Sequence, residues 1–217
     1  MRDLTVDKLL AQRLHLLEDE NRALNHDLQQ LHAALQEATR RQSESRHLAE
    51  HDDLTGLANR RALQTRLQSG IAEAKALQQQ LALIFIDLDG FKQVNDRFGH
   101  VTGDALLGIV ATRIANCVRT QDLACRYGGD EFVVMLTKLG DTSTASSVAA
   151  EIQARIDGRY CIDGQDLAIS ASIGLASYPA DGMQAEALLS SADASMYRSK
   201  QARARSALQP ARDAVAA

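Results

Sequence analysis

Hydrophobic residues follow one pattern before about residue 50 and another pattern after it. In the first segment, leucine recurs at every seventh position, and a second set of leucines lies between, which is the 4-3 alternation of a coiled-coil seam. The same phase continues through residues 38–49 with smaller and more polar residues, so pairing is weaker there. We expect a long helix that pairs with a second copy; the alternative is an amphipathic helix folded back on the rest of the chain. The two leucine sets are Leu10, Leu17, Leu24 and Leu31, and Leu14, Leu28 and Leu35.

Polar residues in and beside this seam indicate how the helices pair. Asn21 occupies a seam position, where asparagine favours a parallel, in-register dimer because its amide can pair with its own copy. In that arrangement Arg13 faces Glu18 of the second copy, and Asp27 can meet His32 in the same way. We therefore predict a parallel homodimer through residues 10–49, within a dimerisation and signalling helix at residues 1–50.

From residue 52 onward, helical and strand periods alternate. The continuous apolar run Leu81–Ile86 has the length and composition of a strand buried on both faces. The pattern predicts an α/β (α+β) fold, a central sheet with helices on its faces, over residues 51–205. Residues 206–217 are expected to be a frayed tail, because Pro210 disfavours a continuing helix. Further helices are expected at about 59–79, 103–118, 143–157 and 185–202, and further strands at about 123–127, 132–136, 159–162 and 166–176.

Composition narrows the possible partners. The 217 residues are 45% apolar, which suffices for an ordinary core, and the formal net charge of -4 argues against nucleic acid or an anionic membrane as partner. No apolar stretch approaches a membrane span, and the first residues lack the apolar core of a signal peptide. The odd number of cysteines (Cys117, Cys125 and Cys161) indicates free thiols in a reducing compartment. We therefore expect a cytoplasmic protein.

A glycine pair followed by two acids separates two predicted strands. Gly128 and Gly129 indicate a tight hairpin, and Asp130 and Glu131 then lie at its tip. Because glycine has no side chain, a ligand can approach this backbone closely. An ordinary surface turn is the alternative, since glycine and aspartate are common turn residues.

A second acidic position favours a functional interpretation of the hairpin. Asp87 directly follows the buried apolar strand, where a carboxylate is costly to desolvate unless it meets a cation. Together with Asp130 it offers only hard oxygen ligands, which suit Mg²⁺ or Mn²⁺ rather than zinc. Pairs of metal ions bound in this way activate a hydroxyl and hold a triphosphate in many phosphoryl-transfer enzymes.

These motifs, taken in order, resemble the GGDEF domain of diguanylate cyclases along residues 51 to about 205. The resemblance implies a palm-like nucleotidyl-cyclase fold in which two GTP molecules condense to cyclic di-GMP and two pyrophosphates. Each 3′-hydroxyl would attack the α-phosphate of the other nucleotide. The matching segments are Asp52–Arg61, Phe85–Asp96, Phe98–His100 with Gly103 and Asp104, Gly128–Phe132, and Ala192 and Asp193 with Met196, Tyr197 and Lys200.

The resemblance also implies roles for individual residues. Asp87, the carbonyl of Leu88, Asp130 and Glu131 would hold two Mg²⁺ (or Mn²⁺) ions per half-site. Asp130 would accept the 3′-hydroxyl proton, and Glu131 would assist as a second carboxylate. The expected substrate contacts are Asn95 and Asp104 to guanine, His100 to the nucleotide, the amides of Phe91 and Lys92 to the terminal phosphates, and Lys200 to the triphosphate.

Two further features concern regulation and affinity. Five residues separate Asp122 from Gly128, which is the family's spacing for a product-inhibition site made by Arg119 and Asp122; a surface salt bridge is the alternative. Ala204 stands where the family usually has an arginine, and neither flanking arginine replaces it automatically, because neighbouring helix positions point about 100° apart. A non-catalytic domain that senses GTP or cyclic di-GMP and signals through the coiled coil is the alternative function.

Overall fold

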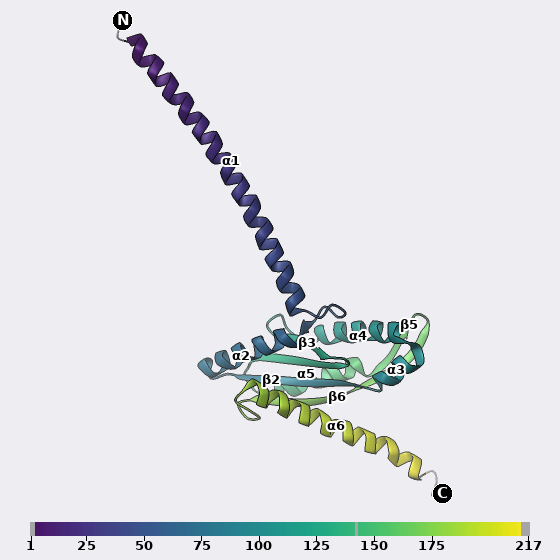
Figure 1. Cartoon of the computed structure of the whole chain (residues 1–217). Coiled ribbons are helices and arrows are strands. Elements are labelled where there is room, and N and C mark those ends of the chain that lie inside the picture. Colours follow the sequence, from purple (N-terminus) through teal and green to yellow (C-terminus); the bar gives the residue numbers. More distant parts are fainter. Residues whose placement is uncertain (1–2, 142, 214–217) are drawn as a thin grey trace. The chain divides into compact units, whose positions relative to one another are not determined.

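The computed structural model describes residues 3–141 and 143–213, with the side chains of residues 3–7, 19, 42–48 and 206–213 left aside. The chain divides into two compact units, residues 1–48 and 49–217. The first unit belongs to one continuous helix, α1 (Asp3–Glu50) (Figure 1). The seven leucines of its predicted seam are each 47–67% exposed, so a single chain leaves the seam uncovered. The coiled-coil pairing itself stays a prediction.

The second unit is built on a six-stranded mixed sheet with the order β1-β3-β4-β2-β6-β5. Among the described strands, the short β1 pairs in parallel with β3, and the other pairs are antiparallel. The strands are β1 (Ala58–Asn59), β2 (Gln80–Asp89), β3 (Leu123–Gly128), β4 (Glu131–Leu139), β5 (Gly158–Ile162) and β6 (Gln165–Tyr178). The helices are α2 (Arg60–Leu77), α3 (Phe91–Phe98), α4 (His100–Ala115), α5 (Ser143–Ile156) and α6 (Ala185–Asp213).

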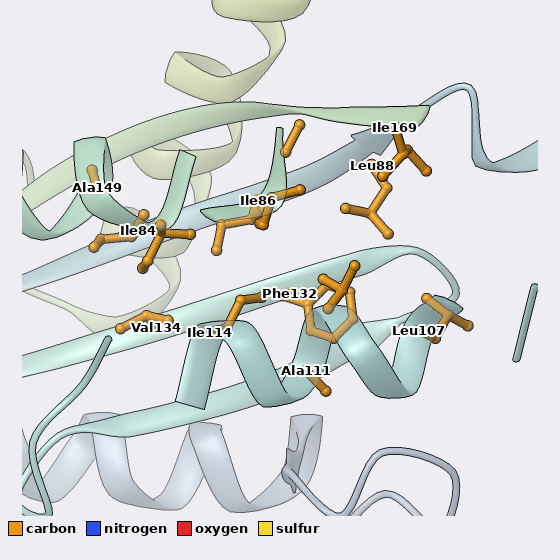
Figure 2. Close-up of a cluster of buried hydrophobic side chains, with 14 of the residues drawn as sticks. Ile84, Ile86, Leu88, Leu107, Ala111, Ile114, Phe132, Val134, Ala149 and Ile169 are labelled. Carbon is orange, nitrogen blue, oxygen red and sulfur yellow. The ribbon is translucent and has the colours of Figure 1, made fainter. Parts of the chain in front are cut away.

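Helices cover both faces of this sheet and bury a core on each. On one face, α4 and α5 pack on alternate residues of β2 and β4, such as Ile84, Ile86 and Phe132 (Figure 2). On the other face, α2 and α6 pack on the intervening residues, such as Leu83 and Phe85. Both faces of β2 are therefore apolar, which explains its unbroken hydrophobic run. The predicted fold class is confirmed.

Several boundaries differ from the sequence prediction. β2 runs on to Asp89, so Asp87 lies within the strand rather than after it. The helix α3 was not predicted. It is flanked by Gly90 and Gly99, which both have positive φ and separate it from β2 on one side and from α4 on the other. The backbone of α6 continues to Asp213, past Pro210 and into the segment expected to be a frayed tail. Residues 214–217 lie outside the described residues.

Within the described residues, no helix combines the length and the apolar character that a membrane crossing requires.

Candidate active site

Two neighbouring central strands bring the acidic residues of the two motifs together. β2 and β4 pair antiparallel so that Asp87 lies directly opposite Glu131. The amide of Leu88 donates to the carbonyl of Asp130 at 3.3 Å, which fixes the hairpin tip against β2. Asp87 is only 8% exposed, and it lies on a strand covered on both sides by neighbours. The predicted acidic site is thus formed by residues far apart in the sequence.

The hairpin turn is centred one residue later than the glycine pair suggests. Gly128 pairs with Glu131 across the hairpin, so Gly129 and Asp130 form the two-residue turn. Gly129 has φ of 51°, whereas Gly128 is not in the left-handed region. Only the second glycine therefore meets a conformational requirement of the turn. The first exposes backbone at the end of β3.

Arg126 of β3 anchors this turn to the segment that follows α1. Its Nε and Nη2 donate to the carbonyl of Gly129 at 3.0 and 2.8 Å, and its Nη1 donates to both carboxylate oxygens of Asp52 at 3.2 Å. Asp52 also accepts from the amide and hydroxyl of Thr55. Burial alone would raise the pKa of Asp52, but these hydrogen bonds and the Arg126 charge together lower it. We did not predict this linkage from the sequence.

The electrostatics of the acidic site favour binding of a cation. Burial, followed by the charge of Asp87, raises the pKa of both Asp130 and Glu131. Lys200 Nζ donates to Asp87 Oδ1 at 2.5 Å and supplies the positive charge nearest to that carboxylate. A carboxylate whose pKa is raised by burial and by acidic neighbours is stabilised in its charged form when a divalent ion binds beside it. Added positive charge would therefore stabilise the charged carboxylates of this site.

The available ligands suit magnesium bound together with phosphate. Across the described side chains, no three acidic, histidine or cysteine groups already converge as a complete metal-ligand set. Mg²⁺ typically binds through one or two carboxylates and takes its other ligands from water and substrate phosphates. Asp87, the Leu88 carbonyl and Asp130 meet that requirement, and Glu131 lies beside them. The residues present thus fit the predicted metal.

The predicted guanine-binding residues gather where α3 meets α4. The side chain of Asn95 approaches Gly103 so closely that a Cβ there would lie 1.9 Å from Asn95 Oδ1. This oxygen is buried and has no hydrogen-bond partner within the described part of the chain. Asp104 follows Gly103, and His100 lies one turn earlier on the same side of α4; both are exposed. An N–H donor that reached this oxygen would satisfy it.

The predicted phosphate contacts lie at the start of α3. Gly90, with φ of 82°, precedes the helix and has no side chain that caps it. The amides of Gln93 and Val94 donate back to the carbonyl of Gly90. The earlier amides, of Phe91 and Lys92, have no intrahelical acceptor in an α-helix and point out of its first turn. They are therefore the amides that a phosphate could reach.

The predicted inhibitory residues lie at the opposite end of the β3–β4 hairpin from the acidic turn. Asp122 accepts from the amides of Arg119 and Thr137 at 3.2 and 3.0 Å. Among the described residues its carboxylate thus holds the loop backbone and does not pair with the Arg119 guanidinium. Arg119 is exposed. A regulatory role for this loop stays a prediction.

The strand order and the acidic, glycine-containing hairpin place the chain among GGDEF-type α/β domains. The family model for the GGDEF domain of diguanylate cyclases matches residues 49–206. The chain belongs to this family, as its motifs predicted.

Named relatives and a solved structure agree with that assignment. MucR of Pseudomonas aeruginosa, a bifunctional diguanylate cyclase/cyclic di-GMP phosphodiesterase, is 46% identical over 153 residues, 70% of this chain and 22% of MucR. The diguanylate cyclase TpbB of the same species is 39% identical over 192 residues, 88% of this chain and 43% of TpbB. The coiled coil and GGDEF domain of DgcB from Caulobacter crescentus, solved with c-di-GMP, has a TM-score of 0.75 at 29% identity and covers 82% of this chain and 95% of that chain. The chain spans less than half the length of the curated relatives that it matches.

Proposed function

We propose that this chain is a diguanylate cyclase that condenses two GTP molecules into cyclic di-GMP and two pyrophosphates. The observation that carries the proposal is the pairing of Asp87 with Glu131 across β2 and β4, with Asp130 at the adjoining turn. The start of α3 and the buried oxygen of Asn95 lie on the segments that follow β2. Carboxylates for a metal, free amides for phosphate and an unpartnered acceptor at Asn95 thus lie on consecutive segments, and these groups match the parts of a nucleoside triphosphate.

The residues of the acidic site would bind the metal and accept the proton. Asp87, the Leu88 carbonyl, Asp130 and Glu131 would hold two Mg²⁺ or Mn²⁺ ions per half-site, which when bound polarise the phosphate and acidify the attacking hydroxyl. Asp130 would accept the 3′-hydroxyl proton as that oxygen bonds to the α-phosphorus and pyrophosphate leaves.

The residues around α3 would select and orient GTP. A carboxylate at Asp104 can accept from guanine N1–H and N2–H₂, whereas adenine offers neither donor there. Asn95 and His100 would complete the base and sugar contacts. The amides of Phe91 and Lys92, with Lys200, would hold the phosphates so that the reacting oxygen lies in line with the leaving group.

The reaction would require two chains. Each domain would hold one GTP, and the product joins two, so two half-sites must face each other. The exposed leucine seam of α1 supports a parallel homodimer, and such a tether raises the effective concentration of the second domain toward the millimolar range. Cyclic di-GMP would then inhibit by binding at Arg119 and Asp122, with the guanidinium gripping a phosphate or a guanine edge.

The alternative function is a domain that binds GTP or cyclic di-GMP without turnover. Such a domain is expected to have lost catalytic carboxylates, whereas Asp87, Asp130 and Glu131 are all present. We therefore favour the enzyme.

Incubation with GTP and Mg²⁺, followed by chromatographic and mass-spectrometric detection of cyclic di-GMP, tests the proposal. Asp130→Asn keeps the side-chain shape but removes the charge, and should reduce synthesis by about 10²-fold or more. Asp166→Asn, at an exposed position on β6, is the matched control and should retain wild-type activity. An Asp130→Asn variant with more than half of the wild-type rate at saturating Mg²⁺ would contradict the assignment.

A further inference from the structure

A cavity of about 590 Å³ lies beside the start of α3, at the ends of β2 and β6 and along α6. Two cations of α6, Lys200 and Arg203, line it and lie three positions apart on one side of the helix. Ala204 also lines the cavity but contributes only a methyl group. The lining residues are Asp89, Gly90, Ser170, Lys200, Ala202, Arg203 and Ala204.

Arg203 is held loosely in this cavity. Its Nη1 lies 3.8 Å from Asp89 Oδ2, and its Nη2 lies 3.8 Å from Asp157 Oδ2. Both distances exceed the 2.7–3.2 Å typical of a hydrogen bond, and the Arg203 side chain is 42% exposed. Such pairs contribute little to stability, so the guanidinium can leave them at small cost.

Neither carboxylate depends on Arg203 for a hydrogen bond. Asp89 accepts from the hydroxyls of Ser170 and Ser172 at 3.1 and 2.8 Å. Asp157 accepts from the side-chain amide of Gln153 and from the backbone amide of Ala171. Movement of Arg203 toward a ligand would therefore leave no carboxylate without a donor, which removes the usual penalty for breaking such contacts.

We propose that Arg203 binds the terminal phosphates of the nucleoside triphosphate and so supplies the guanidinium that Ala204 cannot. This inference rests on the proposed function. The guanidinium presents a planar fork of donors that matches two phosphate oxygens. The free amides of Phe91 and Lys92, which follow Gly90 at the start of α3, would donate to the same phosphates. Lys200 adds a point charge from the preceding turn of α6. The cavity thus holds the phosphate tail between α3 and two cations of α6.

Equilibrium binding of 3′-deoxy-GTP and of GMP to the full chain in Mg²⁺ tests this role. The first ligand carries the triphosphate but lacks the attacking hydroxyl, and the second lacks the β- and γ-phosphates, so neither is condensed. Arg203→Ala should weaken 3′-deoxy-GTP binding by about tenfold or more and change GMP binding by less than about twofold. Arg203→Lys should recover part of the loss, because lysine keeps the charge without the fork.

Arg205→Ala is the matched control, because Arg205 is exposed and points about 200° around α6 from Arg203. It should bind both ligands as the wild type does. Arg203→Ala protein that binds 3′-deoxy-GTP as tightly as the wild type would overturn the inference. Equal losses for both ligands, or a lowered unfolding temperature, would also overturn it by revealing a structural role. Wild-type protein that binds neither ligand would overturn the proposed function itself.

Discussion

Replacing Arg126 with methionine should destabilise the domain and disturb its acidic turn. Methionine keeps much of the side-chain volume but removes the donors that join Asp52 to the carbonyl of Gly129. The Arg126 and Asp52 side chains are only 15% and 24% exposed. Their ion pair is therefore far less screened than most surface pairs.

The structure sets the size of the loss. Removing one partner of a fully buried ion pair costs about 3–5 kcal/mol. Here Asp52 keeps both hydrogen bonds from Thr55, and Gly129 is exposed, so water can replace the lost donors at its carbonyl. We expect a loss of about 2 kcal/mol, which for a domain of this size lowers the unfolding temperature by about 4–8 °C.

Tyrosine fluorescence during urea titration measures this loss in the full chain. All four tyrosines lie after residue 50, so the signal reports on the domain and not on α1. The matched control is Arg155→Met, because Arg155 pairs with Glu151 at sites that are 47% and 49% exposed; its cost should stay below about 0.5 kcal/mol. Equal stability of the Arg126→Met and Arg155→Met proteins would refute the reasoning.

The difference in stability between the wild type and Arg126→Met should depend on pH in one direction. The pKa of Asp52 is lower in the folded protein than in the unfolded chain. The contribution of Asp52 to folding stability is therefore complete above its unfolded pKa and is lost as pH falls through its folded pKa. The wild-type advantage over Arg126→Met should therefore be constant between about pH 5 and 8 and should shrink below about pH 4. An advantage that grew on acidification would contradict the pairing. Because the turn carries Asp130, synthesis should also fall by about tenfold or more.

Two further substitutions test the base contacts and feedback. Gly103→Ala would place a Cβ against Asn95 Oδ1 and should weaken GTP binding by about tenfold. Gly108→Ala, which has open space around it on the same helix, should leave GTP binding unchanged. Equal affinities of the two variants in a GTP titration would contradict the placement of Asn95. Arg119→Ala should keep the initial rate, because Arg119 lies at the far end of the hairpin from the acidic turn, but it should weaken inhibition by added cyclic di-GMP in progress curves. Unchanged inhibition would exclude Arg119 from the regulatory site.

Local patterns sufficed to predict much of the fold and the strand and hairpin that carry Asp87 and Asp130. The apolar run up to Asp87 predicts a buried strand, and the glycine pair before Asp130 predicts a hairpin, although the structure extends the strand to Asp89 and only Gly129 lies in the turn. The helix α3 was missed because it is short and largely polar, and because only its flanking glycines mark its ends. Its existence nevertheless determines where Asn95 lies.

Contacts between distant segments could not be read from the sequence. Arg126 and Asp52 are 74 residues apart, and they meet because the short β1 pairs in parallel with β3. The contacts of Arg203 could not be read from the sequence either, since the sequence predicts only that its side chain points about 100° away from that of Ala204. Its approach to Asp89 depends on how α6 packs across β2 and β6, which is a property of the whole domain.

We propose that synthesis requires two facing half-sites brought together by α1. The most direct test is the rate of cyclic di-GMP formation per chain, measured over a dilution series for the full chain and for a chain lacking residues 1–45, with sedimentation at each concentration. The full chain should keep its specific activity upon dilution, while the truncated chain should be mostly monomeric, with an activity that rises with protein concentration. Full, concentration-independent activity of the truncated chain at nanomolar protein would contradict the account.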